Sequence, residues 1–189
     1  MRQLWLVRHG ETVGESSIRF HGRNDVALSD AGRAQILALV PHVRAARFTA
    51  VIASPLVRAR ESAELLHAGL AAPPATIAIE PDFSEIWFGE LEGMTEAEIR
   101  AAMPEWHARW QRREVLGFPG GETLAGFQQR VSAGLERSLA AHPEGDLLLV
   151  VHRGVIKRIA MHLFGIAAEV GLGTLSVATI RTAMLARPK

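Results

Sequence analysis

Two histidines follow apolar segments of the sequence, and each is closely followed by a glycine. His9 comes after Leu4–Val7 and Arg8, and His152 comes directly after Leu147–Val151. A neutral imidazole can accept a phosphoryl group when its other ring nitrogen is fixed by a hydrogen bond. The guanidinium group of an arginine matches phosphate oxygens with two parallel hydrogen bonds and keeps its charge. These residue types therefore indicate chemistry on a phosphate group.

A second arginine occurs early in a predicted helix. Arg58 lies three residues after Pro55, which follows the apolar segment Thr49–Ala53 and Ser54. The N-terminus of a helix carries partial positive charge and unpaired N–H groups, so it favours anions. A lone arginine there is by default a solvated charge, and a lone histidine at a strand end is usually structural. Two histidines and two arginines at strand ends make a shared anion site the better interpretation.

Short apolar segments alternate with longer segments of helical periodicity. This alternation predicts an α/β fold with three layers, α/β/α, around a mostly parallel central sheet. In such sheets, ligands bind outside the carboxyl ends of the strands. We expect a single domain over residues 1–189, with a small helical cap around 94–119. The predicted strands are Leu4–Val7, Thr49–Ala53, Ala75–Ile79, Asp146–Val151 and a last edge strand at Ala178–Leu185.

Capping residues and prolines predict where helices begin and end. Ser29 can cap a helix that Pro41 kinks or ends. Thr95 opens a capping-box pattern, and Pro104 restarts the helix that follows it. Further helices are predicted after Pro55, from about Leu124 to Ala141 and from Val155 to about Phe164.

The composition is that of an average globular protein, and it excludes several classes. Of the 189 residues, 48% are apolar and 22% are charged. The absence of cysteine removes disulfides, thiolate metal sites and thiol nucleophiles. With 21 basic and 20 acidic residues, no charge excess favours nucleic acid as a partner. Neither a signal peptide nor an apolar stretch of about 18 residues is present, so we expect a cytoplasmic protein without membrane contact.

The residue pattern alone selects neither a general acid nor a metal. Asp82, Glu85, Glu90 and Glu92 are all eligible as the acid by residue type. The apolar neighbours of Glu85 would desolvate its carboxylate, which favours the protonated form. The eight histidines include no pair at common zinc spacings such as H-E-x-x-H, so neither a metal nor another cofactor is expected. A metal site formed by residues from distant positions of the sequence remains an alternative.

The segment Leu6–Thr12 closely resembles the signature of the histidine phosphatase superfamily, the phosphoglycerate-mutase-like proteins. The resemblance covers roughly residues 4–164, keeps the family's motif order and implies the phosphoglycerate-mutase-like fold. In appearance the chain is most similar to α-ribazole phosphatases and broad-specificity small-molecule phosphatases. The further motifs that carry the resemblance are Gly22–Gln35, Ser54–Ala59, Glu85–Gly93, Gly120–Thr123 and His152–Ile156.

The resemblance implies a role for each matching residue. His9 would take the phosphoryl group as phosphohistidine, and Glu85 would protonate the leaving oxygen and later activate water. Arg8, Arg58 and His152 would hold the phosphate oxygens. We also expect Thr12, His21, Gly22 and Arg153 to contact the substrate.

Two positions depart from the family's pattern. Glu15 stands where the family often has asparagine, and its carboxylate would repel a phosphate unless it is turned away or paired with Arg19 or Arg23. Arg153 stands where the family commonly has a small residue, so its side chain either adds charge to the pocket or points to solvent. Both departures bear on substrate choice more than on reaction type.

The family contains mutases and phosphatases, which differ in the segment that covers the site. Dedicated mutases are usually longer, with a central insertion that retains the bisphosphorylated intermediate. Here the segment Met94–Pro119 is compact and helical, which favours entry of water and hydrolysis of a small phosphorylated metabolite. A cofactor-dependent phosphoglycerate mutase is the second interpretation, and a catalytically silent module that binds a phosphorylated ligand is the third. A homodimer is left open, because Leu172–Leu185 could pair at a sheet edge.

Overall fold

A five-stranded sheet forms the centre of the computed structural model, which describes residues 2–165, 170–171 and 173–180. From one edge to the other, the strands are β3 (Ile77–Ile79), β2 (Phe48–Ala53), β4 (Asp146–Val151), β1 (Arg2–Arg8) and β5 (Leu175–Ile180). The pairs β3–β2, β2–β4 and β4–β1 are parallel, and β5 runs antiparallel to β1. The mostly parallel sheet predicted from the sequence is confirmed.

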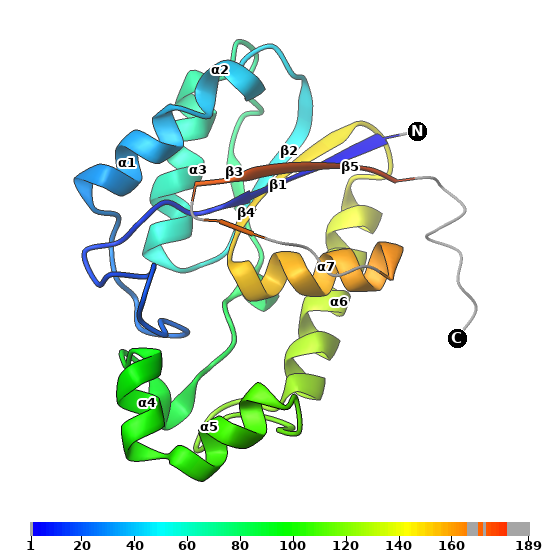
Figure 1. Ribbon diagram of the computed structural model, residues 1–189. Coiled ribbons are helices and arrows are strands. Elements are labelled where there is room, and N and C mark those ends of the chain that lie inside the picture. Colours follow the sequence, from blue (N-terminus) through cyan, green and yellow to red (C-terminus); the bar gives the residue numbers. More distant parts are fainter. Residues whose placement is uncertain (1, 166–169, 172, 181–189) are drawn as a thin grey trace.

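Helices cover both faces of the sheet, as Figure 1 shows. On one face lie α1 (Asp30–Leu37), α2 (Val40–Val43) and α3 (Val57–Gly69); on the other lie α6 (Leu124–Ala141) and α7 (Arg153–Phe164). The strand β4 explains this arrangement, because Leu148 and Val150 pack toward α1–α3 whereas Leu147 and Leu149 pack toward α6 and α7. Successive side chains of a strand point to opposite faces, so a fully apolar strand needs cover on both. The three-layer α/β/α architecture is confirmed.

The predicted capping residues begin their helices in the structure. The hydroxyl of Ser29 accepts a hydrogen bond from the backbone of α1. Thr95 forms the expected capping box at the start of α4 (Glu96–Ala102), and Pro104 begins α5 (Pro104–Gln111). Thr123 caps α6 in the same way as Ser29 caps α1. Side-chain oxygens thus satisfy N–H groups that a helix start leaves unpaired.

Three boundaries differ from the prediction. The helix after Ser29 already ends at Leu37, and Pro41 lies in the first turn of the separate helix α2, where its missing N–H breaks no bond. The strand predicted at Ala75–Ile79 is only β3, because its first two residues do not pair with β2. The edge strand predicted at Ala178–Leu185 begins earlier, at Leu175, and residues 181–185 lie outside the described part. Pairing of this sheet edge with a second copy of the chain, as in a homodimer, stays a prediction.

The parallel register brings three strand ends together. Arg8 pairs with Val151 across β1 and β4, so the residues that follow them, His9 and His152, leave the sheet side by side. Ser54 follows β2 on the other side of β4, and its N–H donates to the carbonyl of Val150 at 3.1 Å. His9 and His152, which the sequence predicts to share one site, therefore both lie at the carboxyl edge of the sheet.

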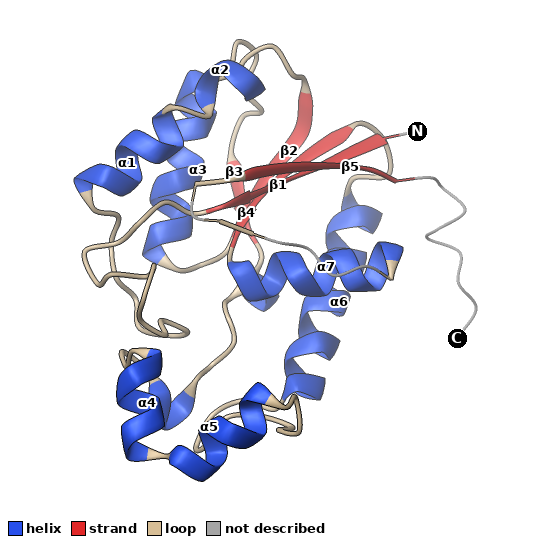
Figure 2. Cartoon of the chain, viewed as in Figure 1, coloured by secondary structure: helices blue, strands red, loops and turns tan. Residues whose placement is uncertain are grey.

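The helices of the segment 94–119 lie away from the sheet. Figure 2 shows α4 and α5 below the layered part, with α5 next to the end of α6 that points away from the strands and with loops linking both helices to the rest of the chain. This position fits the predicted cap; its division from the rest of the chain stays a prediction. None of the helices in the described part combines the length and apolar character needed to cross a membrane.

Candidate active site

His9 lies at the carboxyl end of β1 with one ring nitrogen already engaged. Its Nδ1 donates a hydrogen bond to the carbonyl oxygen of Gly10 at 2.7 Å, which leaves Nε2 with its lone pair free. The imidazole rings of His9 and His152 have centroids 5.1 Å apart. Two imidazoles at this separation can both reach the oxygens and phosphorus of one tetrahedral group. The convergence predicted from the sequence is present.

Ser54 fixes the ring of His152. The hydroxyl Oγ lies 2.7 Å from Nε2 of His152 and also accepts the N–H of Leu56 at 3.3 Å. Since that hydroxyl has a proton to donate, the arrangement favours Nε2 as the acceptor and Nδ1–H as the protonated nitrogen. Nδ1 is buried and has no hydrogen-bond partner among the described residues. Ser54 lies within one of the recognised motifs, but no role was predicted for it; its place between a strand and a helix is the signal that the sequence offers.

Both imidazoles are held in the neutral form. Burial lowers the pKa of His9 and of His152 well below the usual 6.5, and the positive charge of Arg58 acts in the same direction. Each ring is therefore uncharged at neutral pH. A neutral ring is the form that can attack phosphorus.

One buried and one half-buried guanidinium group supply positive charge. Arg58 is fully buried, and its NH2 groups donate to the carbonyl oxygens of His21, Gly22 and Asn24 at 2.8–3.0 Å. Arg8 makes only long contacts, 3.4–3.5 Å, to two backbone carbonyls, and burial lowers its pKa to about 10. Nε of each arginine lacks a partner within the described residues. An anion would satisfy these donors and offset the cost of burying charge.

Glu85 is the carboxylate that reaches the site. It is buried, and its oxygens accept the N–H groups of Ile86 and Gly154, each at 2.9 Å. Of the four acids that the sequence left open, only Glu85 belongs to the described lining of the cavity beside His9. Glu92 instead accepts backbone N–H groups of residues 22–24, and Asp82 pairs with Arg137.

A second ion pair holds the backbone around Glu85. Arg130 and Glu122 form two hydrogen bonds, at 2.7 and 2.8 Å. The same guanidinium donates to the carbonyl oxygens of Asp82, Ser84 and Glu85. This ion pair was not predicted from the sequence, although Glu122 lies in a recognised loop motif.

The other predicted substrate-binding residues divide into two groups. His21 and Arg153 line the cavity. Thr12 and Gly22 are absent from its described lining: the Thr12 hydroxyl contacts Ser16 at 2.8 Å, and the Gly22 backbone is held by Glu92 and Arg58. Their predicted contact with substrate stays a prediction, whereas their structural contacts shape the loop after β1.

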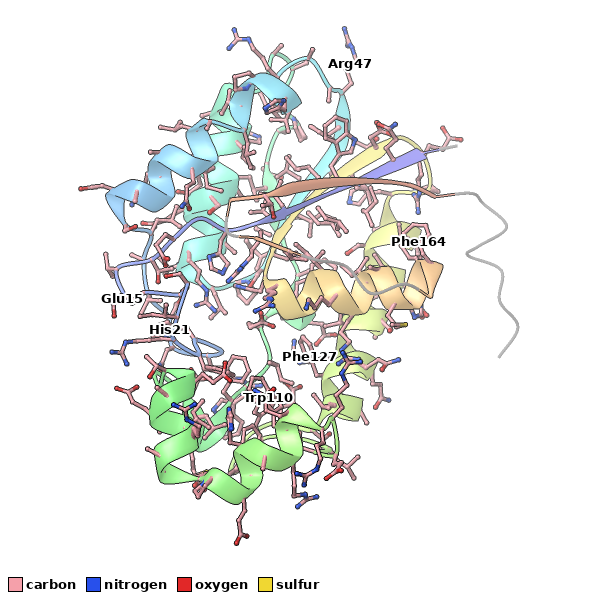
Figure 3. All side chains as sticks on the ribbon, in the orientation of Figure 1. Glu15, His21, Arg47, Trp110, Phe127 and Phe164 are labelled. Carbon is pink, nitrogen blue, oxygen red and sulfur yellow. The ribbon has the colours of Figure 1, made fainter. Side chains whose placement is uncertain are left out.

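Glu15 is turned away from the cavity. Its carboxylate lies 3.1 Å from Nε of Arg19, which also contacts Glu98 at 3.1 Å. Figure 3 shows Glu15 at the outer side of the molecule. Its φ is +58°, a left-handed conformation that asparagine adopts with less strain than glutamate. Repulsion of a bound phosphate is thus avoided.

A cavity of about 590 Å³ extends from His9 toward α4 and α5. Pockets of this size hold whole metabolites rather than single ions. Figure 3 labels Trp110 on α5 and Phe127 on α6, two members of its aromatic wall. Trp106 stacks on Trp110 with ring centroids 6.0 Å apart. The aromatic residues that line the cavity are Phe20, Phe88, Trp110, Phe118 and Phe127.

Metal-ligating residues do not cluster in the described part of the chain. Within residues 2–165, 170–171 and 173–180, no three His, Asp or Glu side chains come close enough to hold one ion. The groups around His9 are instead donors and cations. They are suited to an anionic ligand.

The fold and the site define a three-layer α/β protein with paired imidazoles and guanidiniums at the carboxyl edge of its sheet. The chain belongs to the histidine phosphatase superfamily (branch 1), whose sequence profile matches residues 4–182. The resemblance seen in the motifs is confirmed.

Relatives with different activities share this family. Over 167 residues the chain is 30% identical to the adenosylcobalamin/alpha-ribazole phosphatase of Salmonella typhimurium, covering 88% of this chain and 81% of that protein. Over 172 residues it is 29% identical to the 2,3-bisphosphoglycerate-dependent phosphoglycerate mutase 2 of Gloeobacter violaceus, covering 89% and 78%. The alpha-ribazole phosphatase structure from Shigella flexneri has a TM-score of 0.80 at 25% identity, covering 95% of this chain and 91% of that one. Mycobacterial relatives, 32% identical over 174 residues, are longer, and the chain spans 46% of their length.

Proposed function

We propose that the protein is a phosphoric monoester hydrolase that acts on a small phosphorylated metabolite through a phosphohistidine intermediate, without a metal or cofactor. The position of His9 carries this proposal. Its Nδ1 is held by Gly10, its ring is neutral and lies 5.1 Å from that of His152, and it faces a cavity that Arg8 and Glu85 also line. A neutral imidazole with one fixed nitrogen and cations around it is equipped to attack a phosphate ester.

In the first step, Nε2 of His9 forms a bond to phosphorus as the bond from phosphorus to the ester oxygen breaks. Glu85 gives its proton to the leaving oxygen, so a neutral alcohol departs. Arg8, Arg58 and Nδ1–H of His152 stabilise the charge on the three remaining oxygens, which is the main demand of phosphoryl transfer.

In the second step, water attacks phosphorus and the bond to Nε2 breaks. Glu85, now ionised, takes the proton from water. Inorganic phosphate leaves, and His9 returns to the neutral state. The two steps use the same carboxylate as acid and then as base.

The aromatic wall favours an alcohol portion with a flat apolar ring. Rings of this kind stack or pack edge to face on phenylalanine and tryptophan side chains. An α-ribazole-phosphatase-like activity agrees with this wall and with the named relatives. His21 and Arg153, together with Thr12 and Gly22 from the motif resemblance, complete the proposed set of substrate-binding residues.

Hydrolysis of a chromogenic aryl phosphate tests this function. We expect turnover that is the same with and without a chelator, because the proposed chemistry uses only side chains. Turnover that requires an added divalent metal would contradict the proposed mechanism. No turnover of any phosphate ester would favour the silent binding module.

Glu85→Gln should separate substrates by their leaving groups. Alkyl phosphates need a proton on the departing oxygen, so their hydrolysis should slow by about 10²-fold or more. Aryl phosphates depart without it and should slow much less. The matched control is Glu90→Gln, because Glu90 is an exposed neighbour outside the described lining. Equal slowing of both esters by Glu85→Gln would move the acid role to another group.

Phosphoglycerate mutase activity is the second candidate, because a mutase is among the relatives. Incubation with a phosphoglycerate and bisphosphoglycerate distinguishes the two functions. We expect free phosphate to accumulate. Accumulation of the isomeric phosphoglycerate would favour the mutase.

A further inference from the structure

Positive charge is concentrated on the part of α7 that borders the cavity. The described lining holds five cationic side chains and two carboxylates, although the formal net charge of the whole chain is only +1. Two of the cations already have positions explained above: Arg8 lies beside His9, and Arg19 pairs with Glu15 and Glu98. The other three are Arg153, Lys157 and Arg158, all from the first six residues of α7.

These three cations, which we call the α7 cations, have no acidic partner in the described structure. Some arginines elsewhere do pair with a carboxylate, as Arg33 does with Glu61 at 2.7 Å. The carboxylate of Glu96, which also lines the cavity, is engaged by His107 and Gln111. The α7 cations therefore face the cavity with their charge uncompensated by any described carboxylate.

The position of Arg153 is unfavourable for the helix itself. It is the first residue of α7, whose first turn contains no acidic residue. The N-terminus of a helix carries partial positive charge, so a cation there is locally destabilising. Residues that break a local rule in this way are expected at functional sites. The charge at this point of the chain is better explained by a ligand than by folding.

The helix geometry sets where such a ligand would lie. The N-terminus of α7 is at the proposed phosphoryl site, because His152 precedes the helix and Gly154 contacts Glu85 at 2.9 Å. Lys157 is four residues beyond Arg153, on the same face and about 6 Å farther along the axis. An ester bound at His9 would thus place its alcohol portion alongside the α7 cations.

We propose that the α7 cations bind a second anionic group, a carboxylate or a phosphate, on the alcohol portion of the substrate. This inference rests on the proposed phosphatase function. It goes beyond an α-ribazole-like activity, because the alcohol portion of α-ribazole phosphate carries no anion, and it defines the preferred substrates as esters with an anion about one helical turn from the phosphate that is removed. In a partly enclosed cavity, charges attract more strongly than in open solvent. The α7 cations thereby select the substrate, while the groups around His9 carry out the chemistry.

Three phosphate esters of matched length test this inference. They are ω-hydroxyhexyl phosphate, ω-carboxypentyl phosphate and hexanediol bisphosphate, which end in a neutral group, a carboxylate and a phosphate. For the unaltered protein we expect kcat/KM for at least one anionic ester to exceed that for the neutral ester by about tenfold, after correction for the two equivalent ends of the bisphosphate. The larger of the two anionic values identifies the anion. The preference should fall as salt is raised, because exposed charges are screened.

Replacement of two of the α7 cations is the second part of this test. In the double variant Lys157→Ala/Arg158→Ala, the ratio of kcat/KM between anionic and neutral esters should fall by about fivefold or more. The matched control, Arg60→Ala, removes an exposed arginine on α3 outside the described lining and should leave the ratio unchanged. Equal kcat/KM for all three esters in the unaltered protein, or an unchanged ratio in the double variant, would overturn the inference.

Binding separates this inference from the proposed function. Affinities of the same esters for the His9→Ala protein, measured by calorimetry, should show the same order without any turnover. If no ester is hydrolysed by the unaltered protein, the phosphatase function fails, and a retained affinity ratio still supports the second anion site. Equal affinities would overturn the site even where hydrolysis is observed.

Discussion

Turnover of phosphate esters should fall by about 10⁴-fold or more when His9 is replaced with alanine. The His9 imidazole lies at the cavity that Arg8 also lines, and the hydrogen bond from its Nδ1 to Gly10 leaves the lone pair of Nε2 free to attack phosphorus. Without it, water would have to attack the ester directly. Loss of the His9 imidazole removes the whole first step of the reaction. The residual rate then depends only on the charge stabilisation that the other groups of the site provide.

Trapping the intermediate checks this expectation. Rapid quenching in base should recover phosphohistidine from the unaltered protein and none from His9→Ala. The control is His42→Ala, because His42 is exposed on α2 and lies outside the described lining. Since the pKa of His9 is well below 6.5, the fraction of neutral nucleophile should stay constant between about pH 7.5 and 6.5. Recovery of phosphohistidine from the His9→Ala protein would show that another histidine is the nucleophile.

His152→Ala should cost about 3 kcal/mol or more of transition-state stabilisation, a loss of 10²–10³-fold in kcat/KM, as for one lost oxyanion donor. Nδ1–H of His152 is the donor concerned, because Ser54 engages the other nitrogen. Affinity for vanadate should fall in parallel, since vanadate resembles the transition state more than the substrate does.

A companion variant distinguishes donation from packing. Ser54→Ala leaves the imidazole in place but frees Nε2, so we expect a smaller loss, about fivefold to tenfold in kcat. Both variants need a check of the folded state by circular dichroism, because His152 and Ser54 are buried. Near-normal turnover in a folded His152→Ala protein would contradict the proposed phosphate site.

The convergence of His9 and His152 could be predicted, because each directly follows a strand and parallel strands end at one edge. Their separation could not, since it depends on the register that pairs Arg8 with Val151. Glu85 illustrates a different limit. Four acids share one segment, and only the tertiary fold assigns Glu92 to backbone N–H groups and leaves Glu85 at the cavity.

Residues that support the site were harder to recognise than those with reactive groups. Ser54 acts across 98 positions of sequence on His152, and Arg130 holds backbone carbonyls 45–48 positions away. A hydroxyl or a helix arginine has no local pattern that identifies its distant partner. The start of α2 was missed for a related reason: Pro41 stops one helix or begins another with equal ease, and packing decides which.

The hydrogen bond from Gly154 to Glu85 restricts how this protein can change. A methyl group on Gly154 would meet a Glu85 oxygen at 2.3 Å and Phe127 at 3.2 Å, so any larger residue would push the carboxylate out of place. The second position of α7 is thereby closed to variation as long as the acid is required. Positions 153, 157 and 158 of the same helix also line the cavity, so we expect substrate preference to vary there rather than at position 154.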